Sequence, residues 1–279
     1  HALSASFGFD RLDWDGLFRN FNASGSFLML YPLTYGGTAG VAVFFVVSGF
    51  CIHLSHKRSK DKGWTQFATR RFFRIYPPYL LAVFVFFCLW PWGSFSLDTP
   101  RSIQLITHVL AIHNLDARTF FGINPSFWSI AVEVQLYAIY PLLVLLTTRL
   151  GWRSALAIVG STEIGIRLWT SFGNIFAGMQ IPAYIKFSPF AFWMSWSLGA
   201  YLCECFISGR KSRLFNMRFD VLCVIAFALP LFKPAAPFTF LAFSFLTATA
   251  IERLGTGKWT PSSNARLKPL WSHLKPVSY

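Results

Sequence analysis

The sequence predicts an all-α protein, a polytopic bundle of membrane-spanning helices, and three observations carry this prediction. Hydrophobic residues make up 54% of the chain and charged residues only 13%. The mean hydropathy is +0.47. The apolar residues gather in long runs, and about 17 to 25 residues suffice to cross roughly 30 Å of hydrocarbon. This balance does not fit a soluble globular domain.

The apolar runs predict about seven membrane spans. They lie at about residues 36–56, 77–95, 127–148, 153–172, 189–208, 218–235 and 236–252. The last two are separated only by a short proline-rich segment at 233–237, where we expect a tight hairpin. Residues 102–114 are too few to span and contain polar side chains, so we expect a re-entrant or interfacial element there.

The net charge of +14 could suggest a nucleic-acid partner, but the distribution of the cations argues against one. Lysine and arginine fall near the ends of the apolar runs, as the positive-inside rule predicts. We therefore expect the lipid bilayer, and no nucleic acid, as a partner. The basic segments expected in the cytoplasm are 57–74, 149–153, 210–218 and 253–275, and those expected on the opposite side are 2–35, 96–126 and 173–188.

The five cysteines lie inside or at the edge of apolar runs. They show neither the paired spacing of a disulfide framework nor a Cys/His cluster of the zinc type. We expect no disulfide framework and no metal site.

An arginine cluster follows the first apolar run and its basic loop. Arg70, Arg71 and Arg74 are interleaved with aromatic residues and precede Pro77-Pro78, where we expect an interfacial helix to turn into the membrane. Arg70 and Arg74 share a helical face. The cluster can contact lipid headgroups and fix the membrane topology. Alternatively, it can bind phosphate groups, because guanidinium matches phosphate oxygens in a bidentate way.

Two of the acidic residues within the predicted spans, Glu133 and Glu163, call for an explanation. Glu133 lies about two turns into its run, with Ser129 and Tyr137 on its face. A carboxylate at that depth usually has a purpose, either catalytic or as an interhelical lock held by an arginine of the cluster. Glu163 and Arg167, spaced i and i+4, predict a self-paired structural ion pair.

Histidine is the commonest general base near neutral pH. His53 and His56 fall at the end of the first run, where we expect an interfacial role. His108 and His113 fall in the non-crossing element and are candidates for lining a cavity.

Four motifs follow one another along the chain: residues 40–50 (GVAVFFVVSGF), 70–77 (RRFFRIYP), 126–137 (SFWSIAVEVQLY) and 277–279 (VSY). In order and approximate spacing they resemble the motifs of the membrane-bound acyltransferase-3 family. The resemblance implies a bundle of about ten helices that moves an acyl group, commonly acetyl from acetyl-CoA, onto a hydroxyl of a carbohydrate or similar acceptor. It also implies O-acetylation of a polysaccharide or glycolipid of the cell envelope, in a bacterial inner membrane.

The resemblance also implies roles for individual residues. In the family a histidine ends the first helix, and His1 fits that place as general base or transient acyl carrier. Asp10, Asp13 and Asp15 all lie where members carry an aspartate that would orient the histidine. The resemblance further implies that Arg70, Arg71 and Arg74 bind the phosphates of the donor, with Tyr76 stacking or hydrogen bonding close by. It implies that Glu133 supports the arginine cluster or a polar cavity wall. Ser48 and Gly49 would allow close packing around the pantetheine arm.

One departure from the family pattern stands out, because Ala42 occupies a position where many members have aspartate. We expect residues 1–279 to be a single integral-membrane acyltransferase domain that is truncated at both ends. The competing interpretations are a transporter or flippase, for which intramembrane Glu133, Glu163 and Arg167 are equally natural, and a non-catalytic scaffold. Three closely spaced cations favour the acyltransferase.

Overall fold

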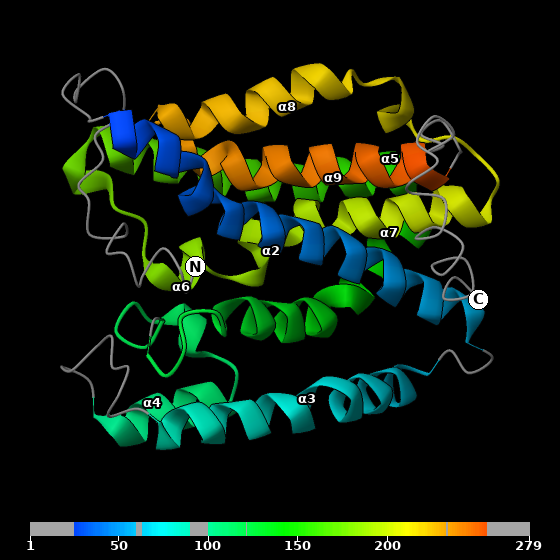
Figure 1. Cartoon of the computed structure of the whole chain (residues 1–279). Helices are drawn as coiled ribbons and strands as arrows, with labels where there is room; N and C mark the ends of the chain where they lie inside the picture. Colours follow the sequence, from blue (N-terminus) through cyan, green and yellow to red (C-terminus); the bar gives the residue numbers. More distant parts are fainter. Residues whose placement is uncertain (1–24, 60–62, 90–99, 121, 233, 256–279) are drawn as a thin grey trace, which may run out of the picture.

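The computed structural model describes residues 25–59, 63–89, 100–120, 122–232 and 234–255, and within these ranges the chain forms helices and no strand (Figure 1). The α-helices are α2 (Gly25–Arg58), α3 (Trp64–Cys88), α4 (Arg101–Val109), α5 (Trp128–Ile175), α6 (Ala183–Lys186), α7 (Trp193–Ile207), α8 (Phe219–Ala228) and α9 (Thr239–Gly255). Short 3-10 turns link them: η3 (His113–Leu115), η4 (Ala177–Met179), η5 (Pro189–Phe192), η6 (Arg213–Asn216), η7 (Leu229–Leu231) and η8 (Ala236–Phe238). The predicted all-α membrane bundle is confirmed.

Four helical segments of the described chain are long and apolar enough to cross a membrane. They are Gly37–Arg58, Trp64–Cys88, Phe127–Ile175 and Ala183–Ile207. The third is broken at Gly151, whose φ of 76° and ψ of 164° are not helical. This break separates the two runs expected at 127–148 and 153–172, and only glycine adopts such a conformation without strain. The predicted run at 218–235 falls on α8 and η7, which form a shorter apolar segment.

The arginine cluster lies on a helix that the two following prolines do not end. The expected turn into the membrane at these prolines stays a prediction. Helix α3 continues through Pro77 and Pro78 to Cys88. Each proline removes one backbone N–H donor from the helix, but membrane helices tolerate this because neighbouring groups compensate for the lost hydrogen bonds. All three arginines therefore lie on the same helix as the apolar segment that follows.

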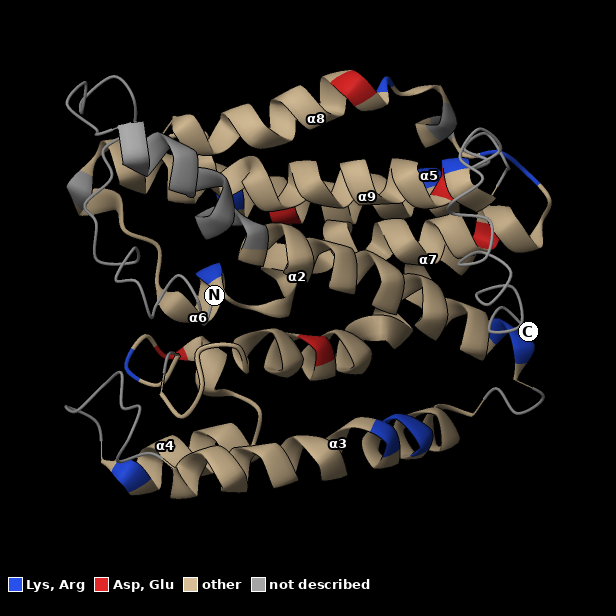
Figure 2. Cartoon of the chain, in the orientation of Figure 1, with Lys and Arg blue, Asp and Glu red and all other residues tan. Residues whose placement is uncertain are grey.

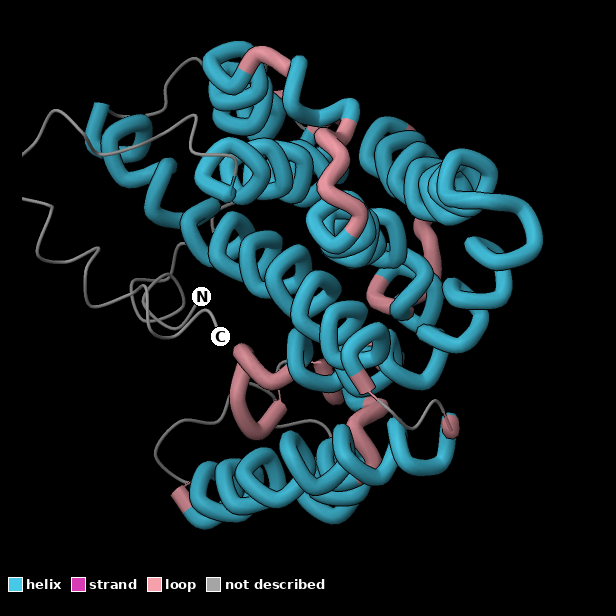
Figure 3. The backbone as a smooth tube through the Cα atoms, turned by 90° about the vertical axis from the view of Figure 1, so that its right-hand side faces the viewer, coloured by secondary structure: helices cyan, strands magenta, loops and turns pink. Residues whose placement is uncertain are grey.

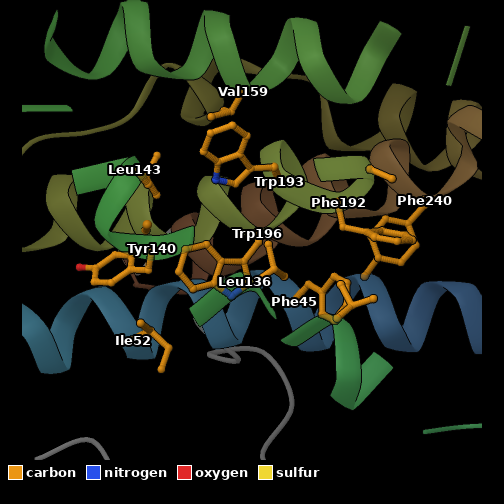
Figure 4. Close-up of a cluster of buried hydrophobic side chains, with 14 of the residues drawn as sticks. Phe45, Ile52, Leu136, Tyr140, Leu143, Val159, Phe192, Trp193, Trp196 and Phe240 are labelled. Atoms are coloured by element: carbon orange, nitrogen blue, oxygen red, sulfur yellow. The ribbon is translucent and has the colours of Figure 1, made fainter. Parts of the chain in front are cut away.

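Helices α2 and α7 form the most extensive contact among the described helices, and two glycines allow their backbones to come close. A methyl group at Gly199 would lie 1.9 Å from the carbonyl oxygen of Val46, and one at Gly49 would lie 2.1 Å from that of Trp196. Small residues allow backbones to approach in this way in membrane bundles. Beside this contact lies an aromatic core that includes Phe45, Tyr140 and Trp196 (Figure 4).

Helices α3 and α4 lie side by side at one edge of the bundle (Figures 1 and 3). Tyr79 of α3 donates a hydrogen bond of 2.6 Å to the carbonyl of His108. Helix α4 is amphipathic and only nine residues long. The prediction of a short element that does not cross is therefore confirmed.

The lysines and arginines of the described residues gather mainly at one end of the bundle (Figure 2). The end of α2, the beginning of α3 and the segment after α7 all bring cations there. The distribution fits the positive-inside pattern, and the cytoplasmic orientation of this end stays a prediction.

Candidate active site

A cavity of about 370 Å³ lies between α3 and the first half of α5. Its polar lining comes from Arg71, Tyr76 and Tyr137. The remaining walls are apolar, formed by Trp64, Phe67, Ala68, Phe72, Ile75, Val134, Ala138 and Pro141. A largely apolar cavity with a few converging polar groups is the usual form of a small-molecule site.

The three arginines separate into one buried and two exposed side chains. Arg71 is only 8% exposed, and its guanidinium lies 5.8 Å from the centre of the Phe67 ring. Arg70 and Arg74 are exposed, and Arg70 donates a bond of 3.3 Å to Ser59. One helical residue turns the chain by about 100°, so Arg71 leaves the face that its neighbours share.

Arg71 forms no ion pair within the described part of the chain, and its Nε has no hydrogen-bond partner there. A buried charge without a partner is costly. The cavity is therefore well suited to an anionic group.

Tyr76 contributes its ring to the cavity and its hydroxyl to the fold. The ring stacks on Phe72 with centroids 4.7 Å apart. The hydroxyl donates to the carbonyl of Val109 and so ties α3 to the end of α4. Its ring, rather than its hydroxyl, is the part placed to contact a ligand.

Glu133 is bound by the hydroxyl groups of two neighbouring side chains. Ser48 donates a bond of 2.7 Å to its Oε1, and the Tyr137 hydroxyl donates to the same oxygen. No ion pair in the described ranges joins Glu133 to an arginine. Because Tyr137 also lines the cavity, the carboxylate stands directly behind the cavity wall.

Ser129, expected on the same face as Glu133, instead donates a hydrogen bond to the carbonyl of Ser126.

Ser48 joins α2 to two other helices. Its Oγ also lies 3.3 Å from Nε1 of Trp196 on α7, which donates to it. Gly49, expected beside the pantetheine arm, faces the backbone of α7 instead. The sequence contained no signal for Trp196, because an indole in an apolar run looks like any other core residue.

His53 is buried inside the bundle, so the interfacial role expected for it is wrong. Its Nδ1 lies 2.9 Å from the Tyr140 hydroxyl and its Nε2 lies 2.9 Å from a carboxylate oxygen of Glu204. Lys57 forms a second ion pair of 2.9 Å with Glu204. The carboxylate in the run at 189–208 was the sequence signal that could have revealed this chain of polar groups.

His108 and His113 form a second buried pair. Their rings stack with centroids 3.8 Å apart, and both side chains are 0% exposed. Burial lowers the pKa of His108 to about 4 and that of His113 to about 2, the latter helped by its histidine neighbour. Neither lines the cavity described above, so their expected role as cavity-lining residues finds no support.

Glu163 and Arg167 form the predicted ion pair. Arg167 Nε donates a bond of 3.0 Å to Glu163, and Ser195 donates to the same carboxylate through its backbone and its hydroxyl. Arg167 also bonds the carbonyl of Ala191 at 3.0 Å. The pair joins α5 to α7, as a structural role requires.

His1, Asp10, Asp13 and Asp15 lie outside the described residues. The structure therefore positions the predicted donor-binding residues, and the predicted catalytic histidine stays a prediction.

Comparison with known sequences decides the family. The family described as an acyltransferase domain matches residues 1–267. The chain belongs to the acyltransferase-3 family. An uncharacterized protein of Haemophilus influenzae is 30% identical over 118 residues, which cover 37% of this chain and 48% of that relative. The chain thus matches about half the length of this relative. No solved structure matches.

Members of this family are membrane acyltransferases, and this chain carries their domain over nearly its whole length. Such a domain needs an acyl donor, an acceptor and a lipid bilayer.

Proposed function

We propose that the protein is an O-acyltransferase that moves an acetyl group from acetyl-CoA to a hydroxyl of a carbohydrate or glycolipid acceptor of the cell envelope. The observation that carries the proposal is the buried Arg71, which forms no ion pair with the described residues and lines a cavity of about 370 Å³. Family membership adds the reaction type.

The donor would approach from the end of the bundle where the cations gather. Its phosphate groups would bind Arg71, with Arg70 and Arg74 adding attraction from the exposed side, since guanidinium binds phosphate oxygens in a bidentate way. The aromatic walls of the cavity and the Tyr76 ring suit the apolar part of the pantetheine arm. Ser48 and Glu133 would fix Tyr137 in the wall that faces this arm.

The transfer would need a base. The acceptor hydroxyl attacks the thioester carbonyl, a new C–O bond forms, and the C–S bond breaks to release the thiolate of CoA. His1 would take the hydroxyl proton as the oxygen attacks and return it to the thiolate. One of Asp10 and Asp13 would orient the imidazole. The alternative role for His1 is that of a transient acyl carrier.

Radiolabel transfer tests the proposal. Membranes containing the protein, supplied with acetyl-CoA labelled in the acetyl group, are expected to incorporate label into lipid or polysaccharide fractions. His1→Ala and Arg71→Ala should abolish or greatly reduce the label, whereas Arg149→Ala, which removes an exposed cation away from the cavity, should retain it. Absence of labelling with any acyl donor, together with substrate flux into vesicles, would support a transporter instead.

A further inference from the structure

A second and larger cavity lies at the cationic end of the bundle, apart from the Arg71 cavity. It measures about 620 Å³ and is bounded by the beginning of the second half of α5, by α7, by α9 and by the segment that follows α7. Arg153, Arg210 and Lys211 line it. The two cavities share no residue.

Basic side chains outnumber acidic ones in the lining of this cavity, which favours an anionic ligand. Among the described residues, Glu204 is the only acidic one in its lining, and its carboxylate already binds Lys57 and His53 at 2.9 Å each. Arg153 and Arg210 are exposed, and no ion pair among the described residues includes either of them. Among the described residues, the cavity's own carboxylate is therefore not paired with Arg153 or Arg210.

The walls favour a ligand with hydrocarbon chains. Leu156, Leu198 and Phe245 come from helices of the bundle and line the cavity. Trp152 and Tyr201 add aromatic rings to the lining, and such amphipathic rings are enriched at membrane interfaces. A free nucleotide would leave the apolar part of the cavity unused.

We propose that this cavity binds an anionic phospholipid, with its phosphate at Arg153 and Arg210 and its acyl chains along the apolar walls. The end of the bundle where the cations gather would face the cytoplasmic leaflet, whose anionic lipids attract basic segments close to the membrane. Glu204, held by Lys57 and His53, would keep the phosphate at the rim by repulsion. This site does not depend on the identity of the acyl acceptor.

Lipid binding to the purified protein tests the site. Native mass spectrometry in detergent would compare the retention of short-chain phosphatidylglycerol with that of phosphatidylcholine of the same chain length. We expect clear preference for phosphatidylglycerol and roughly 30-fold weaker binding in the double variant Arg153→Gln/Arg210→Gln, since each juxtamembrane cation contributes about fivefold. The matched control Arg58→Gln/Arg149→Gln removes the same charge from exposed positions outside the cavity and should bind as the parent does.

Three results would overturn the inference. Equal retention of the two lipids would show that the cavity does not select for the negative charge of the lipid headgroup. Equal losses in the two double variants would show that only net charge matters. Displacement of phosphatidylglycerol by acetyl-CoA, dependent on Arg153 and Arg210, would assign the cavity to a phosphate-bearing nucleotide. Melting temperatures of both variants should match that of the parent, because all four arginines are exposed.

Discussion

Burial distinguishes three arginines that the sequence places within five residues. Arg71 lines the cavity, whereas Arg70 and Arg74 are exposed. Arg71→Ala should therefore lower kcat/KM for acetyl-CoA by roughly 10- to 100-fold, the range expected when a hydrogen bond to a charged group is lost. Arg70→Ala should lower it by less than about fivefold, because exposed charge pairs contribute little.

Steady-state kinetics with varied acetyl-CoA would measure both values, and Arg71→Lys would retain the charge without the planar fork. We expect Arg71→Lys to remain impaired, since bidentate binding is lost. Equal effects of Arg70→Ala and Arg71→Ala would mean that the cluster acts only through its summed charge.

The buried histidine pair makes stability depend on pH in one direction. Burial lowers the pKa of His108 to about 4 and that of His113 to about 2, whereas an unfolded histidine titrates near 6.5. Below pH 6.5 the unfolded state therefore binds more protons than the folded state, and stability falls as the pH drops. For two such groups the fall approaches about 3 kcal/mol per pH unit.

His113→Phe keeps a ring for stacking on His108 and removes one titrating group. Its melting temperature, followed from pH 6.5 to 4.5 in detergent, should decline about half as steeply as that of the parent. If the acid sensitivity came from carboxylates elsewhere, the melting temperature of the variant would fall as steeply as that of the parent.

At the scale of elements, the contact of α2 with α7 depends on glycine. Gly199→Ala should destabilise the protein by about 1 to 3 kcal/mol or more, because the added methyl group meets the backbone of Val46, which cannot move aside as a flexible side chain can. Gly165→Ala is the matched control, since nothing lies within 4 Å of its added methyl group. Thermal unfolding in detergent should show a loss for the first and a small gain for the second; equal effects would argue against close backbone contact.

The sequence predicted elements better than their boundaries and partners. Hydropathy located every apolar run that became a helix, and the i, i+4 spacing predicted the Glu163–Arg167 pair. The prolines of α3 do not end the helix, because in membrane proteins neighbouring helices can replace the backbone hydrogen bonds that proline removes. Partners such as Ser48 for Glu133, 85 residues apart in sequence, depend on how the helices pack. Local spacing carries no information about that packing.

At the scale of the whole molecule, the distribution of charge connects the two proposals. Both cavities receive their cations from the same end of the bundle, where the ends of α2 and α7 and the beginning of α3 meet (Figure 2). A soluble donor and a leaflet lipid would then approach from one compartment. The acceptor and the segment that contains Asp116 and Arg118 would belong to the opposite side, where the described residues carry fewer cations.

This arrangement predicts opposite accessibility of two exposed positions, Ser102 on α4 and Lys211 after α7. In a background without native cysteines, Ser102→Cys should react with a membrane-impermeant maleimide in intact cells. Lys211→Cys should react only after the membrane is permeabilised, because its basic segment is held inside by the positive-inside rule. Labelling of both positions from one side would place the two ends of the bundle in one compartment, and it would remove the reason for assigning donor and acceptor to opposite faces.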